Sequence, residues 1–391
     1  MELKKGYKQT ELGVIPEDWE VKNTTDIVSK NGGMKIGPFG SQLKKELLVE
    51  KGYKVYGQEN VYENNFEVGK RYINEEHFQK LKTCELVSGD FIISMMGTIG
   101  KCVVVPEKIE KGIMDSHLLR LRLNEKKIYT NLLSHFFLSD LLINQVKKLS
   151  VGGIMDGLSS TIIKKIIFPL PPTIQEQIAI ATALNDVDSL ITNIEKLLTK
   201  KRNIKQGAMQ QLLQPKEGWE VKKLGDVVEI KKGQLITDST RINGNIPVIA
   251  GGKTPAYYHN KPNRNGKTIT ISGSGASAGY VSFHNYPIFA SDCSTIEESK
   301  NYSIEYIYYF LLLFQEIIYK KQTGGAQPHI HPSDLSPMDF PCPSKEEQTQ
   351  IATILLDMDA EITALETKLH KYQQLKQGMM QNLLTGKIRL V

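Results

Sequence analysis

A nine-residue polar segment containing glycine occurs twice in the chain, and this repeat constrains the fold more than any other feature. "KQGAMQQLL" runs from Lys205 to Leu213, and "KQGMMQNLL" runs from Lys376 to Leu384. Seven of the nine residues are identical, at an offset of 171. Upstream, "QIAIATALNDVDSLITNIEKLL" (177–198) lies over "QTQIATILLDMDAEITALETKL" (348–369) at the same offset. A repeat of this size predicts a chain of two related halves.

The beginnings of the two halves also match. "WEVK" occurs at 19–22 and at 219–222, an offset of 200, and Gly33 then lies over Gly233. Further along, "FPLP" (168–171) lies over "FPCP" (340–343) at an offset of 172, so the first half carries 200 − 172 = 28 more residues. The ends of the two units are alike and their middles are not. We therefore predict a variable domain over 1–172, a long helix over 173–214, a second variable domain over 215–343 and a second long helix over 344–391.

Apolar residues recur in steps of four and three along each predicted helix, which is a heptad seam. Each helix covers about 35–40 residues, too long to bury a narrow seam inside a small domain. We expect the two copies to pair as an antiparallel coiled coil that acts as a spacer. The alternative, that each stripe packs on its own domain, stays open. The predicted seam residues are Ile180, Leu184, Val187, Ile191, Ile194, Leu198, Ile351, Leu355, Met358, Ile362, Leu365 and Leu369.

The seam turns polar near the end of each helix, at Lys205 and Lys376. A glycine follows two residues later in both copies, at a cost of about 1 kcal/mol against alanine. The same cost at the same place twice suggests close approach of another chain. The predicted docking residues are Gly207, Gln210, Gly378 and Gln381. We assign the paired carboxylates Asp186/Asp188 and Asp357/Asp359 to a solvated helix face.

Both variable domains are rich in strand signals. "GDFIISMMGTIGKCVVVP" (89–106) and "GKTITISGSGASAGYVSF" (266–283) each read as strand, glycine turn and strand, with Gly100 over Gly279. Asp115 then lies over Asp292. The chain is therefore expected to be α+β, with two α/β domains separated by two long helices in a pseudo-twofold repeat. A shared frame with different loops is what two binding modules for different targets require.

Motifs for catalysis fail on their context. "GASAG" (275–279) matches a nucleophile elbow, but that elbow must run from a strand into a helix, and a strand-like segment follows here. The two "GKT" segments lack the glycine that a phosphate loop needs five residues earlier. His329 and His331 alternate with no third metal ligand nearby. We therefore expect a non-catalytic chain that holds no metal or cofactor.

Composition restricts the partners and the compartment. A net charge of +6 and a pI near 8.8 permit an acidic partner such as nucleic acid. The four cysteines form no CxxC pair, which is typical of reduced thiols in the cytosol. The start of the chain has no signal-peptide pattern, and the longest apolar run, "YIYYFLLLF" (306–314), reads as a buried helix. We expect a cytoplasmic protein with no membrane contact.

Several segments together resemble the specificity (S) subunits of Type I restriction–modification systems, over nearly the full chain. They are "GVIPEDWEVK", "GDFIISMMGTIGK", "SSTIIKKIIFPLPPTIQEQIAIATALNDVD", "KQGAMQQLL" and "KQGMMQNLLTGKIRL". The resemblance implies two target recognition domains that bind double-stranded DNA. It implies a complex with two modification (methyltransferase) subunits and with restriction (motor and nuclease) subunits. S-adenosylmethionine and ATP with Mg would then be bound by those partners and not by this chain.

This resemblance predicts a bipartite, asymmetric DNA target with one half-site for each domain. Lysine and arginine side chains would contact phosphates, and polar loop side chains would read base edges. We predict DNA contacts at Lys35, Ser41, Gln42, Gln58, Asn60, Lys101, Lys253, Tyr257, His259, Asn263, Arg264 and Lys267. Three alternatives stay open: the specificity subunit of another restriction enzyme class, a coiled-coil scaffold with two sugar- or peptide-binding domains, and a stand-alone enzyme.

Overall fold

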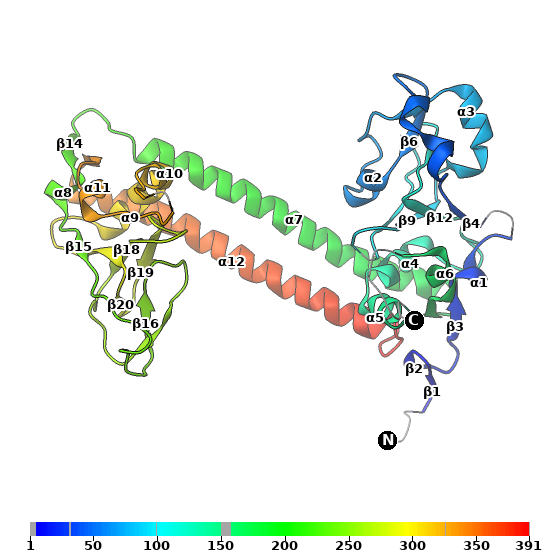
Figure 1. Ribbon diagram of the computed structural model, residues 1–391. Helices are drawn as coiled ribbons and strands as arrows, with labels where there is room; N and C mark the ends of the chain where they lie inside the picture. The colour runs from blue at the N-terminus through cyan, green and yellow to red at the C-terminus, as the bar shows by residue number, and fades with distance from the viewer. Residues whose placement is uncertain (1–4, 31–32, 99, 150–157, 325, 391) are drawn as a thin grey trace. The chain divides into compact units, whose positions relative to one another are not determined.

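The computed structural model describes residues 5–30, 33–98, 100–149, 158–324 and 326–390, and it divides into two compact units. The first unit comprises residues 1–193 and 370–391, and the second comprises residues 194–369. Two long helices contribute one segment each to both units: α7 (Ile174–Leu212) and α12 (Lys345–Leu383) (Figure 1). Each helix has 39 residues, and their starts and ends differ by 171. The predicted length of about 35–40 residues is confirmed, although the second helix ends at Leu383 and not at residue 391 as predicted.

The strand-rich body of the first unit, here called the first domain, contains two main sheets. The four-stranded sheet has the order β10 (Cys102–Val104), β9 (Phe91–Ser94), β12 (Leu118–Leu121), β4 (Met34–Ile36). The five-stranded sheet has the order β5 (Leu48–Val49), β7 (Tyr72–Ile73), β6 (Tyr53–Tyr56), β11 (Gly112–Met114), β8 (Glu85–Leu86). Only β6 and β11 run parallel among the pairs of these described strands.

Shorter elements complete the first domain. A hairpin joins β1 (Tyr7–Thr10) to β2 (Gly13–Pro16), and β3 (Glu20–Asn23) pairs with β13 (Ile167–Leu170). The helices are α1 (Thr24–Ile27), α2 (Gln58–Tyr62), α3 (Glu75–Lys80), α4 (Thr130–Phe137), α5 (Asp140–Leu149) and α6 (Ser160–Lys165). Asn23 caps α1, because its side-chain oxygen accepts the backbone N–H groups of Thr25 and Asp26.

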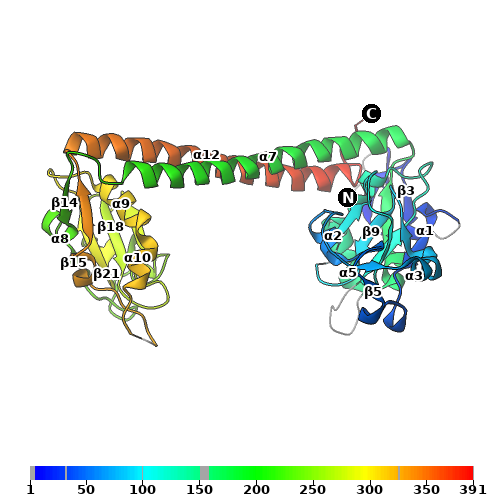
Figure 2. The ribbon, with the colours of Figure 1, turned by 90° about the horizontal axis from the view of Figure 1, so that it is seen from above.

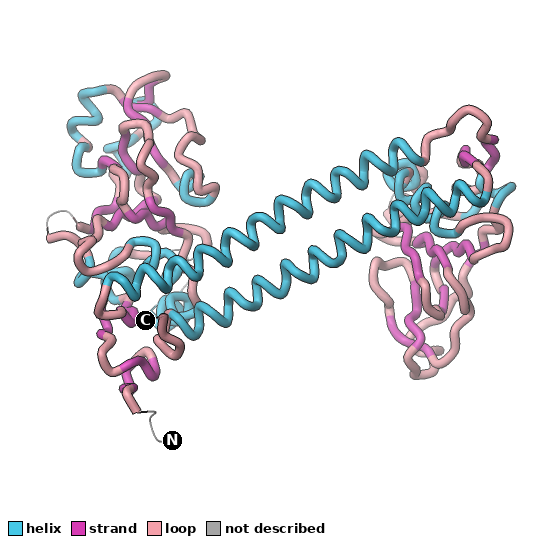
Figure 3. Tube along the Cα trace, turned by 180° about the vertical axis from the view of Figure 1, so that it is seen from behind, coloured by secondary structure: helices cyan, strands magenta, loops and turns pink. Residues whose placement is uncertain are grey.

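The second domain, the strand-rich body of the second unit, repeats this plan. Its four-stranded sheet has the order β15 (Lys231–Lys232), β21 (Cys293–Glu297), β18 (Thr268–Ser272), β19 (Val281–His284). Its three-stranded sheet has the order β17 (Tyr257–His259), β16 (Ile246–Ile249), β20 (Phe289–Ala290), and β14 (Glu220–Lys223) pairs with β22 (Asp339–Cys342). The helices are α8 (Leu224–Val227), α9 (Ile304–Leu313), α10 (Gln315–Lys320) and α11 (Pro332–Leu335). Figure 3 shows strands in both domains and none in the long helices.

Strand pairing gives the equivalence of the two domains residue by residue. The backbone N–H of Ser94 donates to the Lys101 carbonyl at 2.9 Å, and that of Ser272 donates to the Tyr280 carbonyl at 3.0 Å, so the alignment of Gly100 with Gly279 is confirmed. Gly37 donates to Leu118 at 3.1 Å as Gly233 donates to Cys293 at 2.8 Å. The alignment of Gly33 with Gly233 was therefore wrong by four residues, because the segments before these edge strands differ in length.

The alignment of Asp115 with Asp292 was also wrong, by one residue. Asp115 donates its backbone N–H to Tyr56 at 2.8 Å at the end of the parallel pair β6–β11. In the second domain, Ser291 makes the corresponding bond to Ile249 at 2.7 Å, at the end of β16–β20. Asp115 is thus equivalent to Ser291, and Asp292 lies one position further along. The two aspartates nevertheless lie in the same region of their domains.

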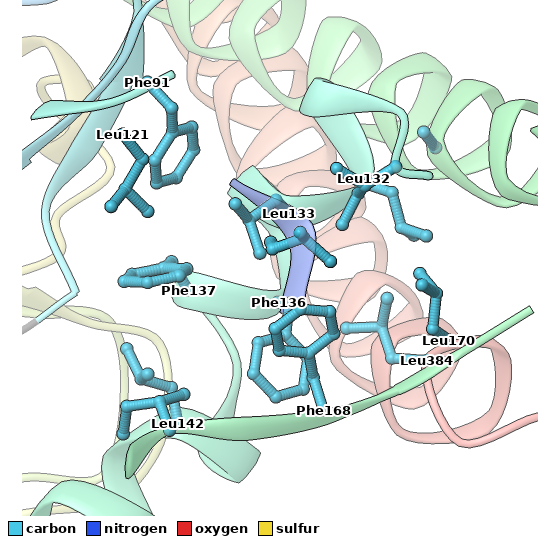
Figure 4. Close-up of a cluster of buried hydrophobic side chains, with 14 of the residues drawn as sticks. Phe91, Leu121, Leu132, Leu133, Phe136, Phe137, Leu142, Phe168, Leu170 and Leu384 are labelled. Atoms are coloured by element: carbon cyan, nitrogen blue, oxygen red, sulfur yellow. The ribbon is translucent and has the colours of Figure 1, made fainter. Parts of the chain in front are cut away.

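The first core joins the first domain to the ends of both long helices (Figure 4). Its aromatic centre includes Phe136 and Phe168, whose ring centroids lie 5.1 Å apart. Ile180 and Leu184 of α7 and Leu383 of α12 belong to the same cluster. Burial of such side chains stabilises the fold by about 1.5–3 kcal/mol each. The first two seam positions of α7 therefore pack on the preceding domain, as the alternative interpretation held.

The core of the second unit repeats this arrangement. Ile351 and Leu355 of α12 pack with Tyr306, Phe310 and Phe340 of the second domain. Met209 and Leu213, at the end of α7, lie in the same cluster. Helix α9 is buried along most of its length, which confirms the buried helix expected from "YIYYFLLLF".

The predicted seam residues are buried or half-buried along both long helices. Of the twelve predicted seam side chains, eight are buried, and Ile191, Met358, Leu365 and Leu369 are half-buried. In the second unit, Lys201 pairs with Glu361 at 2.5 Å and Arg202 with Glu366 at 2.6 Å. In the first unit, Lys376 pairs with Asp188 at 2.5 Å. The two helices lie side by side and antiparallel in each unit (Figure 2), so the predicted coiled coil is confirmed.

Asp188 and Asp359 were assigned to a solvated helix face, and the structure corrects this. Each is the partner of a lysine on the other helix, Lys376 and Lys205 respectively. Each also lies against its own domain: Asp359 accepts the Tyr309 hydroxyl at 2.7 Å, and Asp188 lies 3.9 Å from His135 Nδ1. Heptad spacing alone could not identify these partners, because they come from a distant part of the chain.

Candidate nucleic-acid interface

Three loops of the first domain meet at the carboxyl end of the parallel strands β6 and β11. The meeting point is Asp115, which is 5% exposed. A Cβ atom added at Gly37 would lie 1.8 Å from the Asp115 carbonyl oxygen, and one added at Gly57 would lie 2.8 Å from its Oδ2. Gln58 Nε2 donates to Ser94 Oγ at 2.7 Å, which ties in the β9–β10 loop. Only glycine permits such close approach, so the three loops are held together.

The Asp115 carboxylate is fully engaged within the protein. Its Oδ2 accepts a hydrogen bond from Arg71 Nη2 at 3.0 Å, and its Oδ1 accepts the backbone N–H of His117 at 3.0 Å. Arg71 also donates to Glu59 at 3.0 Å. A paired and buried carboxylate supports structure, since an unpaired one would carry a large desolvation cost. Asp115 therefore holds the loops in place, and the tips of the loops are the parts available to contact a ligand.

The second domain brings the corresponding loops together at Ser291 and Asp292. A Cβ atom added at Gly233 would lie 2.0 Å from the Ser291 carbonyl oxygen. The Ser274 hydroxyl donates to the Asp292 carboxylate, and the backbone N–H of Gly273 donates to the Asp292 carbonyl at 3.0 Å. The loop after β16 joins them, because the Ser272 hydroxyl donates to the Gly251 carbonyl at 2.9 Å. The corresponding three loops are therefore held together in both domains, by different side chains.

A lysine lies over a tyrosine ring in the loops of each domain. Lys101 Nζ lies 5.9 Å from the ring centroid of Tyr62, and Lys253 Nζ lies 5.2 Å from that of Tyr280. Lys101 and Tyr280 are equivalent residues, so the cation and the ring have exchanged places between the two domains. A cation–π contact orients an exposed lysine without removing its charge. Both domains thus present an oriented positive charge beside the glycine turn.

The predicted DNA contacts separate into two groups. Gln58, Lys101 and Lys253 lie in the loop clusters, and Lys35 and Gln42 line a groove of about 530 Å³ that also contains Phe39. The side chain of Ser41 lies outside the described residues.

The other predicted contacts are engaged within their own domains. Asn60, 1% exposed, accepts the Gly57 N–H at 2.9 Å and donates to Asn65 and Val68. His259 is buried and accepts the Ile242 N–H at 3.1 Å. These two side chains therefore support loops within their own domains. The polar atoms of Tyr257, Asn263, Arg264 and Lys267 also bond within their domain, to Ile236, Ala290, Thr295 and Glu305 respectively.

Sequence reasoning missed the residues that position these loops, notably Arg71, Tyr62 and Tyr280. Arg71 is distant in sequence from Asp115, so no local pattern links them. Tyr280 had a usable signal, because it directly follows Gly279 as Lys101 follows Gly100. That match pointed to a position where one domain carries a cation and the other an aromatic ring.

Each unit also has a groove beside a repeated helix end. In the first unit a groove of about 550 Å³ is lined by Leu138, Met380 and Gln381 among others. In the second unit a groove of about 710 Å³ is lined by Gln210, Phe314 and Ile317 among others. Gln210 and Gln381 differ by 171 and are both predicted docking residues. Leu138 and Phe314 are each the C-cap of the helix before the groove.

Gly207 and Gly378 are open to solvent on the side where a side chain would project. A Cβ atom added at either position meets nothing within 4 Å in the described chain. The glycines therefore serve no close packing within the described residues. A close approach by another chain remains the prediction that explains why both copies keep a poor helix former.

The described residues offer little for covalent or metal chemistry. They contain no group of three or more His, Cys, Asp and Glu that could hold a metal ion. "GASAG" lies between β18 and β19, which confirms that it is not a strand-to-helix elbow. Burial raises the pKa of the Cys102 and Cys293 thiols to about 12, so both are protonated at neutral pH. Within the described parts of the chain, no helix is long and apolar enough to cross a membrane.

Known proteins resemble the chain along nearly its full length. A Methanocaldococcus jannaschii protein named as the MjaX specificity subunit of a type I restriction enzyme is 27% identical, with 98% of this chain and 97% of that protein covered. The Type I restriction enzyme MjaVIII specificity subunit of the same organism is 25% identical, with 96% and 94% covered. The crystal structure of a Type I restriction–modification S subunit from M. genitalium has the same fold, with a TM-score of 0.64, 16% identity and 98% of both chains covered.

The family match covers most of both halves. The Type I restriction modification DNA specificity domain matches residues 16–206 and again residues 216–377. Each match contains one strand-rich domain and most of the long helix that follows it. The internal repeat in the sequence is therefore a duplication of this domain, and the chain belongs to the family of Type I restriction modification DNA specificity proteins.

Proposed function

We propose that this chain is the DNA sequence-specificity subunit of a Type I restriction–modification complex. It binds a bipartite, asymmetric DNA target, one half-site for each domain, and directs partner methyltransferase and restriction subunits to that target. One observation supports the proposal: a single chain holds two DNA specificity domains whose four-stranded sheets share one strand order and whose loops differ. The shared sheet places the loops of both domains in corresponding positions, and the different loop sequences select different bases.

The loop clusters around Asp115 and Asp292 are the proposed DNA-reading surfaces. Lys101 and Lys253, oriented over tyrosine rings, are suited to phosphate contacts that set the register of each domain on the duplex. Polar side chains of the same loops then read base edges in the groove. The first recognition domain corresponds to residues 1–172 and the second to residues 215–343, and the segments 173–214 and 344–391, which contain α7 and α12, are the spacers.

The two grooves beside the repeated helix ends are the proposed docking surfaces for two copies of the modification subunit. Their duplication at equivalent positions favours two copies of one partner over two different partners. Restriction subunits complete the assembly. Catalysis then belongs to the partners, which bind S-adenosylmethionine and ATP with Mg, and the complex acts in the cytoplasm on double-stranded DNA.

The decisive experiment is to co-express the chain with its modification subunit and to map methylated bases by sequencing. A bipartite motif with two different halves is expected. A continuous motif, or no methylation, contradicts the proposal. Replacing residues 23–150 with another recognition domain sharpens the test, because only one half of the motif should change.

Two measurements separate the alternatives. A scaffold for sugars or peptides would show no salt-dependent DNA binding, whereas phosphate contacts make DNA affinity fall steeply with salt. Methyl transfer by the purified chain alone would indicate a stand-alone enzyme. The identity of the partner that co-purifies with the chain separates a Type I complex from another restriction enzyme class.

A further inference from the structure

Phe39 and Leu235 occupy equivalent positions in the two domains, and both project apolar side chains into solvent. Phe39 is 60% exposed and Leu235 is 77% exposed. Each lies two residues after the glycine that leaves an edge strand, Gly37 after β4 and Gly233 after β15 (Figure 1). The hydrogen bonds of these glycines to Leu118 and Cys293 establish the equivalence. The sequence around the two residues gives no hint of it.

The backbone on both sides of each apolar tip is held in place. The Phe39 carbonyl accepts the Gln42 N–H at 3.2 Å, and the preceding residue is Pro38, whose φ is restricted. Gln234 donates its N–H to the Ala290 carbonyl at 2.9 Å, and Ile236 donates its N–H to Ser291 Oγ at 3.2 Å. Both loops therefore display a large apolar side chain on a fixed backbone. An apolar side chain exposed in this way does not stabilise the free protein, but its burial against a bound partner would stabilise the complex.

Lysines lie near both tips and point to the kind of partner. The groove of about 530 Å³ beside Phe39 is lined by Lys35, Lys80 and Lys164, and its described lining contains no Asp or Glu. Lys80 also pairs with Glu76. Leu235 lies three residues after Lys232 of β15 (Lys231–Lys232), and Lys231 also pairs with Glu229 and Glu297. An apolar tip between lysines suits a partner with phosphates outside and apolar base surfaces inside, because apolar side chains contact thymine methyl groups or enter between base pairs.

We propose that Phe39 and Leu235 place their side chains directly against the bases of their respective half-sites. The inference rests on the proposed function and adds an apolar contact to the polar loop residues. Removing an apolar base contact should weaken binding to the cognate duplex by about tenfold or more, without changing the number of phosphate contacts. Affinity for the cognate site should therefore fall, while the salt dependence of binding stays the same.

The test uses the complex with the modification subunit and the duplex identified by methylation mapping. Phe39→Ser and Leu235→Ser are compared with the conservative Phe39→Leu and Leu235→Met, which should retain cognate affinity. Val87→Ser is the matched control. Val87 is also an exposed apolar residue, at 41%, but it lies before the start of strand β9, whereas the loop cluster lies at the other end of that strand, at Ser94. Thermal unfolding checks that each variant folds, since all three substituted positions are exposed.

Two DNA substitutions distinguish the form of the contact. If uracil in place of one thymine abolishes the difference between wild type and the serine variant, the contact is to the thymine methyl. If 2-aminopurine fluorescence rises with wild type and not with the serine variant, the side chain opens a base step. Either result supports the proposal, and weaker binding with neither signature overturns direct base contact.

Other outcomes are equally informative. Wild-type affinity in both serine variants overturns this inference and leaves the specificity function standing. Loss of the modification subunit from the variant complex would show a protein-contacting surface and also overturns it. If the wild-type complex itself has no bipartite target, the proposed function fails, and the inference fails with it.

Discussion

Lys376 Nζ on α12 lies 2.5 Å from Asp188 Oδ1 on α7 in the first unit. The equivalent residues, Lys205 on α7 and Asp359 on α12, form the same pair in the second unit. Each lysine that interrupts the apolar seam therefore meets an aspartate of the opposite helix. A polar pair inside an apolar seam disfavours other registers, since a shift would leave the charges unpaired. The duplicated sequence thus encodes its own antiparallel alignment.

The Lys205–Asp359 pair should show a measurable coupling energy. We expect Lys205→Met and Asp359→Asn to be non-additive by about 0.5–1 kcal/mol in the free energy of unfolding. The reason is that Lys205 is only 16% exposed and the Tyr309 hydroxyl also binds the carboxylate. A double-mutant cycle in urea measures this coupling.

The Arg202–Glu366 pair provides the control, because its side chains are 59% and 47% exposed. Its coupling should be near zero, since solvent screens an exposed pair. Equal coupling energies for the two pairs would show that the seam lysine has no special role.

Gln177 and Gln348 should each make a large contribution to stability. Gln177 Oε1 accepts the Tyr129 N–H at 2.8 Å, and Gln348 Oε1 accepts the Ser303 N–H at 3.0 Å, so each helix start is bonded to its own domain. Both glutamines are nearly fully buried. Alanine at either position leaves a buried N–H unsatisfied and should destabilise the fold by about 1–3 kcal/mol.

Chemical denaturation of the single variants checks this expectation. The control is Gln374→Ala, whose side chain lies exposed on α12 beside His370 and should change stability by less than about 0.5 kcal/mol. If Gln177→Ala is as stable as wild type, water replaces the lost amide and the predicted coupling of helix to domain is wrong.

The repeated elements were predictable from the sequence because they depend on local periodicity. Heptad spacing and prolines located the starts of both helices to within one residue, although the second predicted helix ran eight residues past Leu383, and glycine turns located the β9–β10 and β18–β19 hairpins. The alignment failed at Gly33 and at Asp292, where loop length rather than local pattern sets the register. Asp115 with Arg71, and Asp188 with Lys376, join residues far apart in the chain. Such partners follow from tertiary packing, so the candidate site was predicted as a region and not as a geometry.

His284 should make the stability of the chain depend on pH in the acid range. Burial lowers the pKa of His284 to about 4, while an unfolded histidine titrates near 6.5. The unfolded state therefore binds the proton first, and stability falls as the pH drops from about 6.5 to about 4. The interval of about 2.5 pH units corresponds to about 3 kcal/mol at most.

The test is to measure the free energy of unfolding of wild type and of His284→Gln between pH 7 and pH 4. Carboxylates that titrate in this range affect both proteins alike, so the difference between the two proteins isolates the contribution of His284. The difference between the two curves should shrink as the pH falls. Parallel curves for wild type and His284→Gln would contradict the predicted protonation.

Leucine at Gly207 and Gly378 should separate helix stability from partner binding. Because a Cβ atom meets nothing within 4 Å at either position, leucine should stabilise the isolated chain by up to about 1 kcal/mol through helix propensity. The same side chain should obstruct the adjacent surface for the modification subunit. Native mass spectrometry of the co-expressed complex should then show one modification subunit with either single variant and none with the double variant. Thr367→Leu, at an exposed position of α12, should retain both copies. Two copies bound to the double variant would show that these segments are helix ends without a docking role.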